Sequence, residues 1–140
     1  MTIRRRTLAL VAAASCLPAL TGCGLLEPES GPVPVTITSS SWNGWDRNHK
    51  PTPKTTTIDA TKGASVPFTG FVDFEITFTD VGEDSVELTT SEPMSPRGES
   101  GGLHLRDTET EFTVERGETL RFSTPTMDGG MHYEVTLASR

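Results

Sequence analysis

The side chains in this sequence that are best suited to chemistry are soft metal ligands in its second half. Residues 127–135 read MDGGMHYEV, which brings together Met127, Met131 and His132, and His104 lies upstream of them. Thioether and imidazole groups favour Cu(I) in secreted proteins. These residue types therefore suggest a site for copper or another soft metal.

The turn between the two methionines predicts how these side chains are positioned. Asp128-Gly129 is typical of a two-residue type I′ loop between antiparallel strands. Such a loop places Phe122 opposite Val135 and Leu120 opposite Leu137, so that apolar residues face one another across the hairpin. We therefore predict a β-hairpin with this register.

The predicted hairpin separates the candidate ligands, because successive side chains of a strand alternate between its two faces. Met131 should join Tyr133 on the core face, whereas His132 should lie on the outer face close to Met127. His104 lies between two leucines, so it should also point outward. The metal hypothesis is thereby restricted to Met127, His132 and His104. The alternative, ordinary surface residues, is favoured because a few soft ligands without a complete motif are common.

The His and Met content also resembles that of the periplasmic copper chaperones with a cupredoxin-like fold. That family uses a spaced set of ligands ending in His-x-Met, whereas the order here is Met131-His132-Tyr133, so only the residue types match. The resemblance implies, as an alternative function, a carrier of copper outside the cytoplasm. Without such a role we expect no cofactor.

One serine resembles the nucleophile of known hydrolases. Residues 98–102 read GESGG, which fits G-x-S-x-G and looks like the GDSGG of trypsin-like proteases. An esterase elbow needs a strand before the serine and a helix after it, and no helical period follows Ser100. His49 lacks the sequence context of the protease base, and the chain is too short for the two barrels of such a protease. We therefore predict that the protein is not an enzyme.

The start of the chain predicts export and a lipid anchor. Residues 1–23 combine three arginines, a short apolar stretch and small residues before Cys23, which is typical of a secretory signal and too short to span a membrane. The last four of these residues, LTGC, resemble the lipobox of bacterial lipoproteins. The resemblance implies that residues 1–22 are removed and that Cys23 carries acyl chains. These chains would hold the protein on the extracytoplasmic face of the cell membrane.

Residues 1–23 do not decide the export route, and the source of the protein is suggested by the composition of the whole chain. Arg5-Arg6 leaves both the general secretory route and the twin-arginine route open. The chain is richer in arginine than in lysine, which resembles proteins from actinobacteria and other high-GC organisms. We expect a small lipoprotein of this kind.

Charge and cysteine content exclude several functions. The net charge is −7, and it falls to −10 when residues 1–22 leave with their three arginines, so nucleic acid is not an expected partner. Cys16 leaves with the signal and Cys23 is the predicted lipid attachment, so no thiol remains for catalysis, a disulfide or a thiolate metal site. The expected partners are the membrane, through the lipid, and an unknown protein or cell-wall ligand.

Alternating apolar and polar residues predict the fold of the rest. Residues 24–32 have no period and suggest a flexible tether that follows Cys23, and residues 91–102 are rich in Pro, Gly and Ser and suggest a long loop. About seven short strands are expected, at residues 33–38, 70–79, 86–88, 103–105, 112–114, 120–122 and 131–137. This spacing predicts one domain over residues 33–140, an all-β antiparallel immunoglobulin-like β-sandwich, with a cupredoxin-like barrel as the alternative.

Both tryptophans fall in one polar segment, WNGWDRNHKP at residues 42–51, which we expect to be a loop between strands. In one interpretation Trp42 and Trp45 fill an open end of the sandwich, which is the commoner fate of large aromatic residues. In the other they present flat apolar faces to a sugar or a protein. If the protein is a binding module, Trp42, Trp45 and the loop at 91–102 are the expected contact surface.

Overall fold

The computed structural model describes residues 31–98 and 105–139 of the chain. Every element in this part is a β-strand. The eight strands are β1 (Val33–Asn43), β2 (Lys54–Ala60), β3 (Ser65–Phe68), β4 (Phe74–Val81), β5 (Ser85–Pro96), β6 (Glu109–Glu115), β7 (Thr119–Ser123) and β8 (Gly129–Leu137). All pairings are antiparallel, so the predicted all-β antiparallel class is confirmed.

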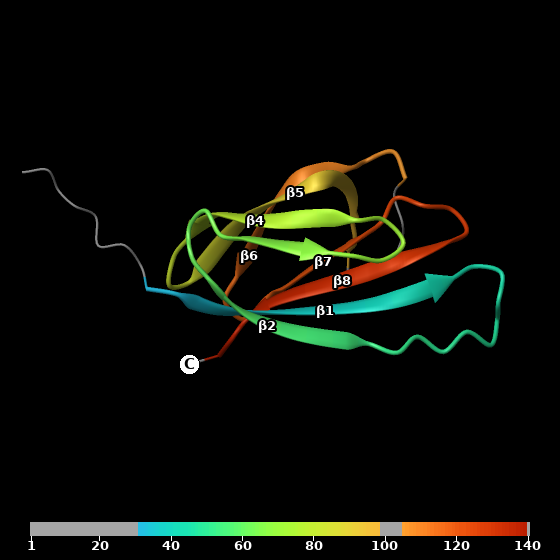
Figure 1. Cartoon of the computed structure of the whole chain (residues 1–140), viewed down its shortest axis with the longest axis horizontal. Helices are drawn as coiled ribbons and strands as arrows, with labels where there is room; N and C mark the ends of the chain where they lie inside the picture. Colours follow the sequence, from blue (N-terminus) through green and yellow to red (C-terminus); the bar gives the residue numbers. More distant parts are fainter. Residues whose placement is uncertain (1–30, 99–104, 140) are drawn as a thin grey trace, which may run out of the picture.

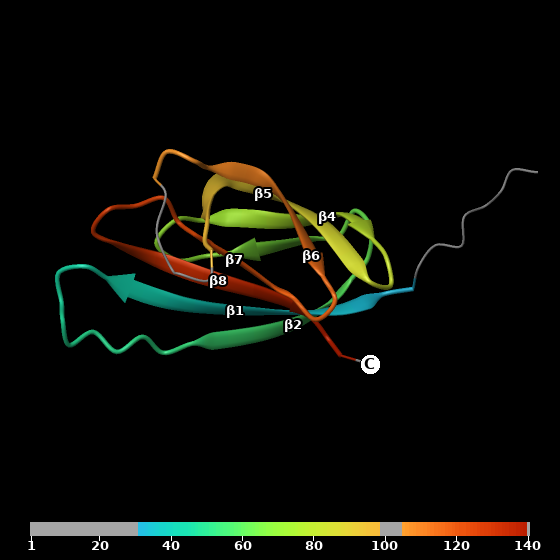
Figure 2. The same ribbon diagram turned by 180° about the vertical axis from the view of Figure 1, so that it is seen from behind.

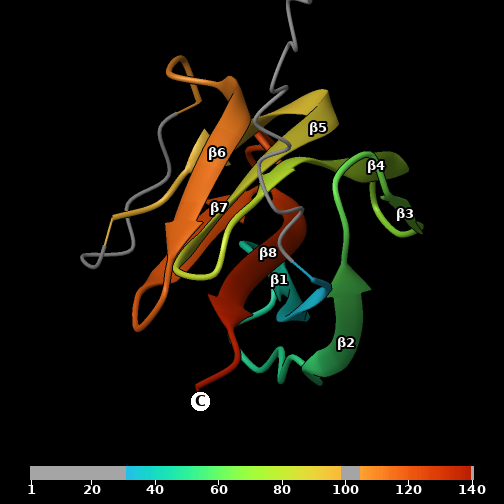
Figure 3. The same cartoon turned by 90° about the vertical axis from the view of Figure 1, so that its left-hand side faces the viewer.

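The strands form one curled sheet that folds over on itself. Its order is β2-β1-β8-β7-β5-β4-β3, and β6 pairs with β5 beside this path. Strand β5 joins the two layers, because its first half pairs with β4 and β6 whereas Ser95 and Pro96 pair with β7. Figure 3 shows the two layers around a common interior. The described residues include no helix that could cross a membrane.

The alternating residues form the core as the sequence predicts. Phe74, Ile76 and Phe78 are buried along β4 while the residues between them are more exposed. A bulge between Phe78 and Asp80 inserts one extra residue, which turns Val81 inward as well. The other fully buried apolar side chains are Val35, Ile37, Ala60, Val86, Leu88, Met94, Val114, Phe122, Tyr133 and Val135.

Two strands were not predicted, and the reason is their composition. β2 reads KTTTIDA and β3 reads SVPF, and each pairs with one neighbour only, β1 and β4 respectively. Strands at the edge of a sheet bury little, so they need no apolar alternation. β2 is accordingly exposed along most of its length.

The predicted loop at residues 91–102 is wrong over its first half. β5 continues to Pro96, and Met94 is fully buried. The ladder to β6 is interrupted between Thr89 and Met94, where β5 leaves one layer for the other, so Pro93 is tolerated in a stretch without regular pairing. The predicted strand at 103–105 is also not seen at its described residue, since Leu105 lies in an exposed bend.

The hairpin of β7 and β8 exists, but its predicted register is wrong by two residues. Leu120 pairs with Val135 and Phe122 with Tyr133, so the loop between the strands is longer than Asp128-Gly129. Neither residue has the positive φ that a type I′ turn requires. Because side chains alternate with a period of two, the predicted inward and outward faces survive this shift.

The two ends of the sandwich are different. The start of β1 and the end of β8 lie at one end, as Figures 1 and 2 show. The opposite end is built from the connections β1–β2, β3–β4 and β7–β8. The tryptophans belong to this second end, which is referred to below as the loop end.

Candidate functional site

The structure places the two tryptophans in different environments. Trp42 is not in a loop but lies in β1, where it pairs with Gly130 of β8 and is half-buried. Trp45 lies in the β1–β2 connection and is 78% exposed. The interpretation that both residues fill the end of the sandwich is therefore wrong for Trp45.

The loop that carries Trp45 is held by specific hydrogen bonds. The Asn43 Oδ1 accepts the backbone N–H of Trp45 at 2.9 Å and that of Asp46 at 3.4 Å. The next residue, Gly44, donates its N–H to the carbonyl oxygen of Asp128 in the β7–β8 connection at 2.9 Å. Side-chain caps of this kind favour one loop conformation. Trp45 is thus exposed on an ordered loop.

A cleft of about 500 Å³ opens beside Trp45 at the loop end. Its lining comes from β1, the start of β8 and three connections, β1–β2, β3–β4 and β7–β8. The lining residues are Ser41, Trp42, Asn43, Trp45, His49, Phe71, Asp128, Gly129, Gly130 and Met131. We call this concavity the aromatic cleft.

Phe71 is the cleft residue that sequence reasoning missed. It lies in the β3–β4 connection and is 62% exposed, and this connection approaches β8 closely enough that a Cβ on Gly70 would lie 3.8 Å from the Met131 Cγ. The Asp73 side chain accepts the N–H of Gly70 at 3.2 Å and helps to fix the connection. The sequence could have indicated that Phe71 is exposed, because it falls among the outward positions of the alternating pattern that buries Phe74.

Behind the cleft, His132 supports Trp42. Their rings stack with centroids 5.7 Å apart and planes 11° from parallel. The His132 Nδ1 lies 2.6 Å from the Ser123 Oγ. Burial and, to a lesser extent, the positive charge of Arg97 lower the pKa of His132 to about 4, and the negative charge of Glu134 only partly opposes this shift. His132 is therefore neutral at pH 7 and packs against Trp42 as an uncharged ring.

The candidate metal ligands are distributed as follows. His132 is on the outer face as predicted, but it lies opposite Ser123 and against Trp42. Met127 is 78% exposed in the β7–β8 connection, and the two-residue change in register removes the predicted alignment that brought it near His132. Met131 is half-buried against the core, close to its predicted place. In the described part of the chain, no three His, Cys, Asp or Glu side chains form a group that could hold a metal ion.

Several predicted features lie outside the described residues. These are His104, Ser100, Cys23 with its lipobox, and the tether up to residue 30. Of the predicted contact loop at 91–102, the part up to Pro96 is strand, with Met94 and Ser95 fully buried. Of the predicted contact surface, the structure therefore describes Trp42 and Trp45, which both line the aromatic cleft.

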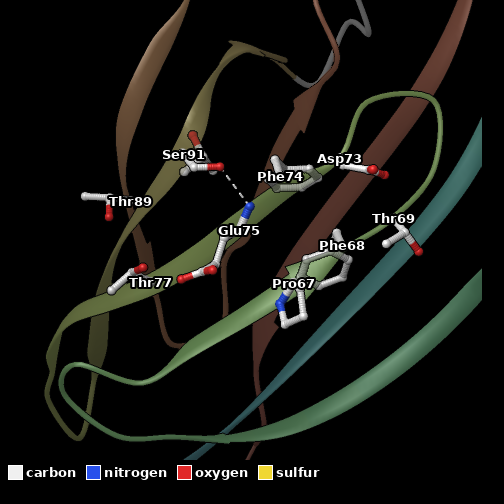
Figure 4. A pocket seen from close by; sticks show the side chains of 10 residues that line it. Pro67, Phe68, Thr69, Asp73, Phe74, Glu75, Thr77, Thr89 and Ser91 are labelled. Carbon is white, nitrogen blue, oxygen red and sulfur yellow. Dashed lines mark hydrogen bonds between the residues drawn. The ribbon is translucent and has the colours of Figure 1, made fainter.

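A second concavity, of about 440 Å³, lies beside β3, β4 and β5 (Figure 4). Its polar lining residues are hydroxyl and carboxylate side chains, and the Ser91 Oγ in it accepts the backbone N–H of Glu75 at 2.9 Å. Asp73 is engaged with Gly70. The lining contains no imidazole, thiol or cationic side chain.

Comparison with known proteins gives no relative for this chain. No protein-family model matches it, and neither does any curated protein or solved structure. The functional conclusion therefore depends on the chemistry of the aromatic cleft.

Proposed function

We propose that this protein is a membrane-anchored extracytoplasmic lipoprotein whose β-sandwich is a non-enzymatic binding module, with the aromatic cleft as its binding site. The observation that carries the proposal is the exposure of Trp45 and Phe71 around one cleft, on connections fixed by hydrogen bonds. Burial of apolar surface stabilises a protein by about 25 cal/mol per Å², and aromatic side chains left in water lack this stabilisation. A group of such exposed side chains marks a binding site. Ordered loops also lose little entropy when a ligand binds.

The arrangement of the two ends supports the anchoring part of the proposal. The chain enters the sandwich at the end opposite the cleft (Figure 1). A lipid on Cys23 would attach the protein through this entry side. The aromatic cleft would then face away from the membrane, where an extracytoplasmic ligand is accessible.

The hydrogen bonds of the cleft support a role without catalysis. The Ser41 Oγ lies 3.1 Å from the His49 Nε2, which is the distance expected of a nucleophile and its base. The same Nε2 lies 3.3 Å from the carbonyl oxygen of Ser41. In the tautomer that donates to this carbonyl oxygen, Nε2 carries the proton and cannot take one from Ser41. The pair is better suited to holding the loop than to acyl transfer.

Replacing Cys23 by serine should release the protein from the membrane. The acyl chains supply the anchoring free energy, and the acidic domain has little attraction to anionic lipid headgroups. The measurement is the distribution of the chain between membrane and soluble fractions of the producing cell. Cys16→Ser, which leaves the lipobox unchanged, is the matched control. A Cys23→Ser chain that stays with the membrane would contradict the lipid anchor.

Small solutes should bind preferentially at the aromatic cleft. A nuclear magnetic resonance screen of the detergent-solubilised full chain against a fragment library can follow both indole N–H signals, because the protein has only two tryptophans. We expect fragment hits to shift the signals of Trp45 and Trp42, and Trp45→Ala to abolish most hits. Leu105→Ala, which removes another exposed apolar side chain, should leave them unchanged. Hits spread evenly over the surface would argue against a binding module of this design.

A further inference from the structure

We propose that the ligand of the aromatic cleft is a methylated ammonium group, such as a quaternary amine, held by aromatic faces and the carboxylate of Asp128. This inference rests on the proposed binding function and specifies the chemical class that the site takes. It follows from three features of the cleft, namely its free ring faces, its charge and the state of its polar groups.

The aromatic rings of the cleft are available to a ligand. Trp42 and Trp45 come from the end of β1 and the connection after it, Phe71 comes from the β3–β4 connection, and none of the three rings stacks on another. Trp42 uses one face against His132, and Trp45 and Phe71 have no ring contact with other described residues. Faces of Trp and Phe attract cations that lie within about 6 Å of the ring centre. Several such faces around one space are the usual device for recognising quaternary ammonium groups.

The charge of the cleft also favours a cation. Its lining includes one acidic residue, Asp128, and neither lysine nor arginine. The carbonyl oxygen of Asp128 accepts the N–H of Gly44, but its carboxylate has no hydrogen bond or ion pair with any described residue. Arg47 and Lys50 belong to the same connection as Trp45 but do not line the cleft. The net negative charge of the whole chain would add attraction for a cation at long range.

Several polar groups around the rings are already paired, which leaves fewer partners for the hydroxyls of a sugar. Ser41 and His49 bond to each other, and Asn43 Oδ1 accepts two backbone N–H groups. A saccharide presents many hydroxyls and needs free partners for them, because unpaired buried hydroxyls weaken binding. A methylated ammonium group has few or no N–H donors and needs only a negative potential and apolar contact. Asp128 and the rings supply both.

Choline and its neutral analogue 3,3-dimethyl-1-butanol provide the test, because the two differ only by carbon in place of the charged nitrogen. Each is titrated into the detergent-solubilised full chain and followed through the indole signals of Trp45 and Trp42. We expect choline to bind about tenfold or more tightly than the neutral analogue, and added salt to reduce this preference. Equal binding of the two would overturn the ammonium assignment while leaving the binding function supported. Binding of a neutral probe, cellotetraose, in preference to choline would overturn it in the same way.

Substitutions locate the effect. Trp45→Ala and Phe71→Ala should each weaken choline binding about tenfold, and Trp45→Phe should retain part of it. Asp128→Asn should weaken choline binding but not that of the neutral analogue, whereas Asp59→Asn, which removes an equal charge from β2, should change neither. All these side chains are exposed or belong to loops, so thermal unfolding should confirm that each variant folds. An unchanged choline affinity in Trp45→Ala would place any binding elsewhere and contradict the proposal.

Discussion

Replacing Tyr133 by alanine should lower the free energy of unfolding by about 3–5 kcal/mol. Tyr133 is 2% exposed and is the largest fully buried side chain of the described core. From β8 its ring meets two rings of the other layer edge-to-face, with ring centroids 5.0 Å from Phe74 of β4 and 5.8 Å from Phe68 of β3. It also stacks on Phe122 of β7, with the ring centroids 5.4 Å apart. The ring therefore joins the two layers of the sandwich, and its loss leaves a cavity between them.

Urea unfolding followed by circular dichroism measures this effect, and Tyr133→Phe is the matched control. The control keeps the ring and removes the hydroxyl, for which no hydrogen bond with a described residue is found, so its cost should stay below about 1 kcal/mol. Since domains of this size are stable by only about 5–15 kcal/mol, Tyr133→Leu provides a milder variant if the alanine variant fails to fold. A loss below about 1 kcal/mol in Tyr133→Ala would contradict the packing described here.

Replacing Gly130 by alanine should cost about 1–3 kcal/mol and displace Trp42. A Cβ at this position would collide with the hydroxyls of Thr124 and Thr126 and lie 3.0 Å from the Trp42 Nε1. The two hydroxyls cannot move away without losing hydrogen bonds. Thr124 is fully buried and its Oγ1 accepts the N–H of Met131 at 3.0 Å, and the Thr126 Oγ1 donates to the Gly129 carbonyl oxygen. The Trp42 Nε1 has no partner among the described residues and has little room to move.

The measurements for Gly130→Ala are urea unfolding and the indole signal of Trp42. Gly70→Ala is the control, because a Cβ there meets only the Met131 Cγ at an ordinary 3.8 Å. Its stability should be unchanged or slightly raised, since alanine reduces the entropy of the unfolded chain. A Gly130→Ala variant that is as stable as the wild type and has an unshifted Trp42 signal would contradict the close approach of Trp42 and the two threonine hydroxyls to Gly130.

Gly130 also shows where local sequence rules fail in this chain. The residues Asp128-Gly129 suggested a tight turn, in which glycine is needed for a positive φ. In the structure the turn is longer, and glycine is needed at Gly130 because an indole and two hydroxyls approach its backbone. Which of the two reasons applies depends on residues of β1 that are distant in sequence. A pattern of neighbouring residues cannot contain that information.

The same limit applies to β5 and to the cleft. The Pro and Ser content of residues 91–96 is typical of a loop, yet this segment is strand because it crosses between layers and pairs with β7. Trp45 could be identified as a candidate from its type and its polar surroundings. Phe71 could not be placed beside it, since the two belong to connections that meet only at the loop end of the folded sandwich.

The all-β class, the outward direction of His132 and the inward faces of the apolar strands β1, β4, β6, β7 and β8 could be predicted from the sequence. These follow from the two-residue period of a strand, which is a local property and survives even a register error of two residues. The edge strands, the path of β5, the stack of His132 on Trp42 and the grouping of cleft residues became apparent only in the folded chain. Those features depend on which distant segments lie side by side, and that is set by the packing of the whole core.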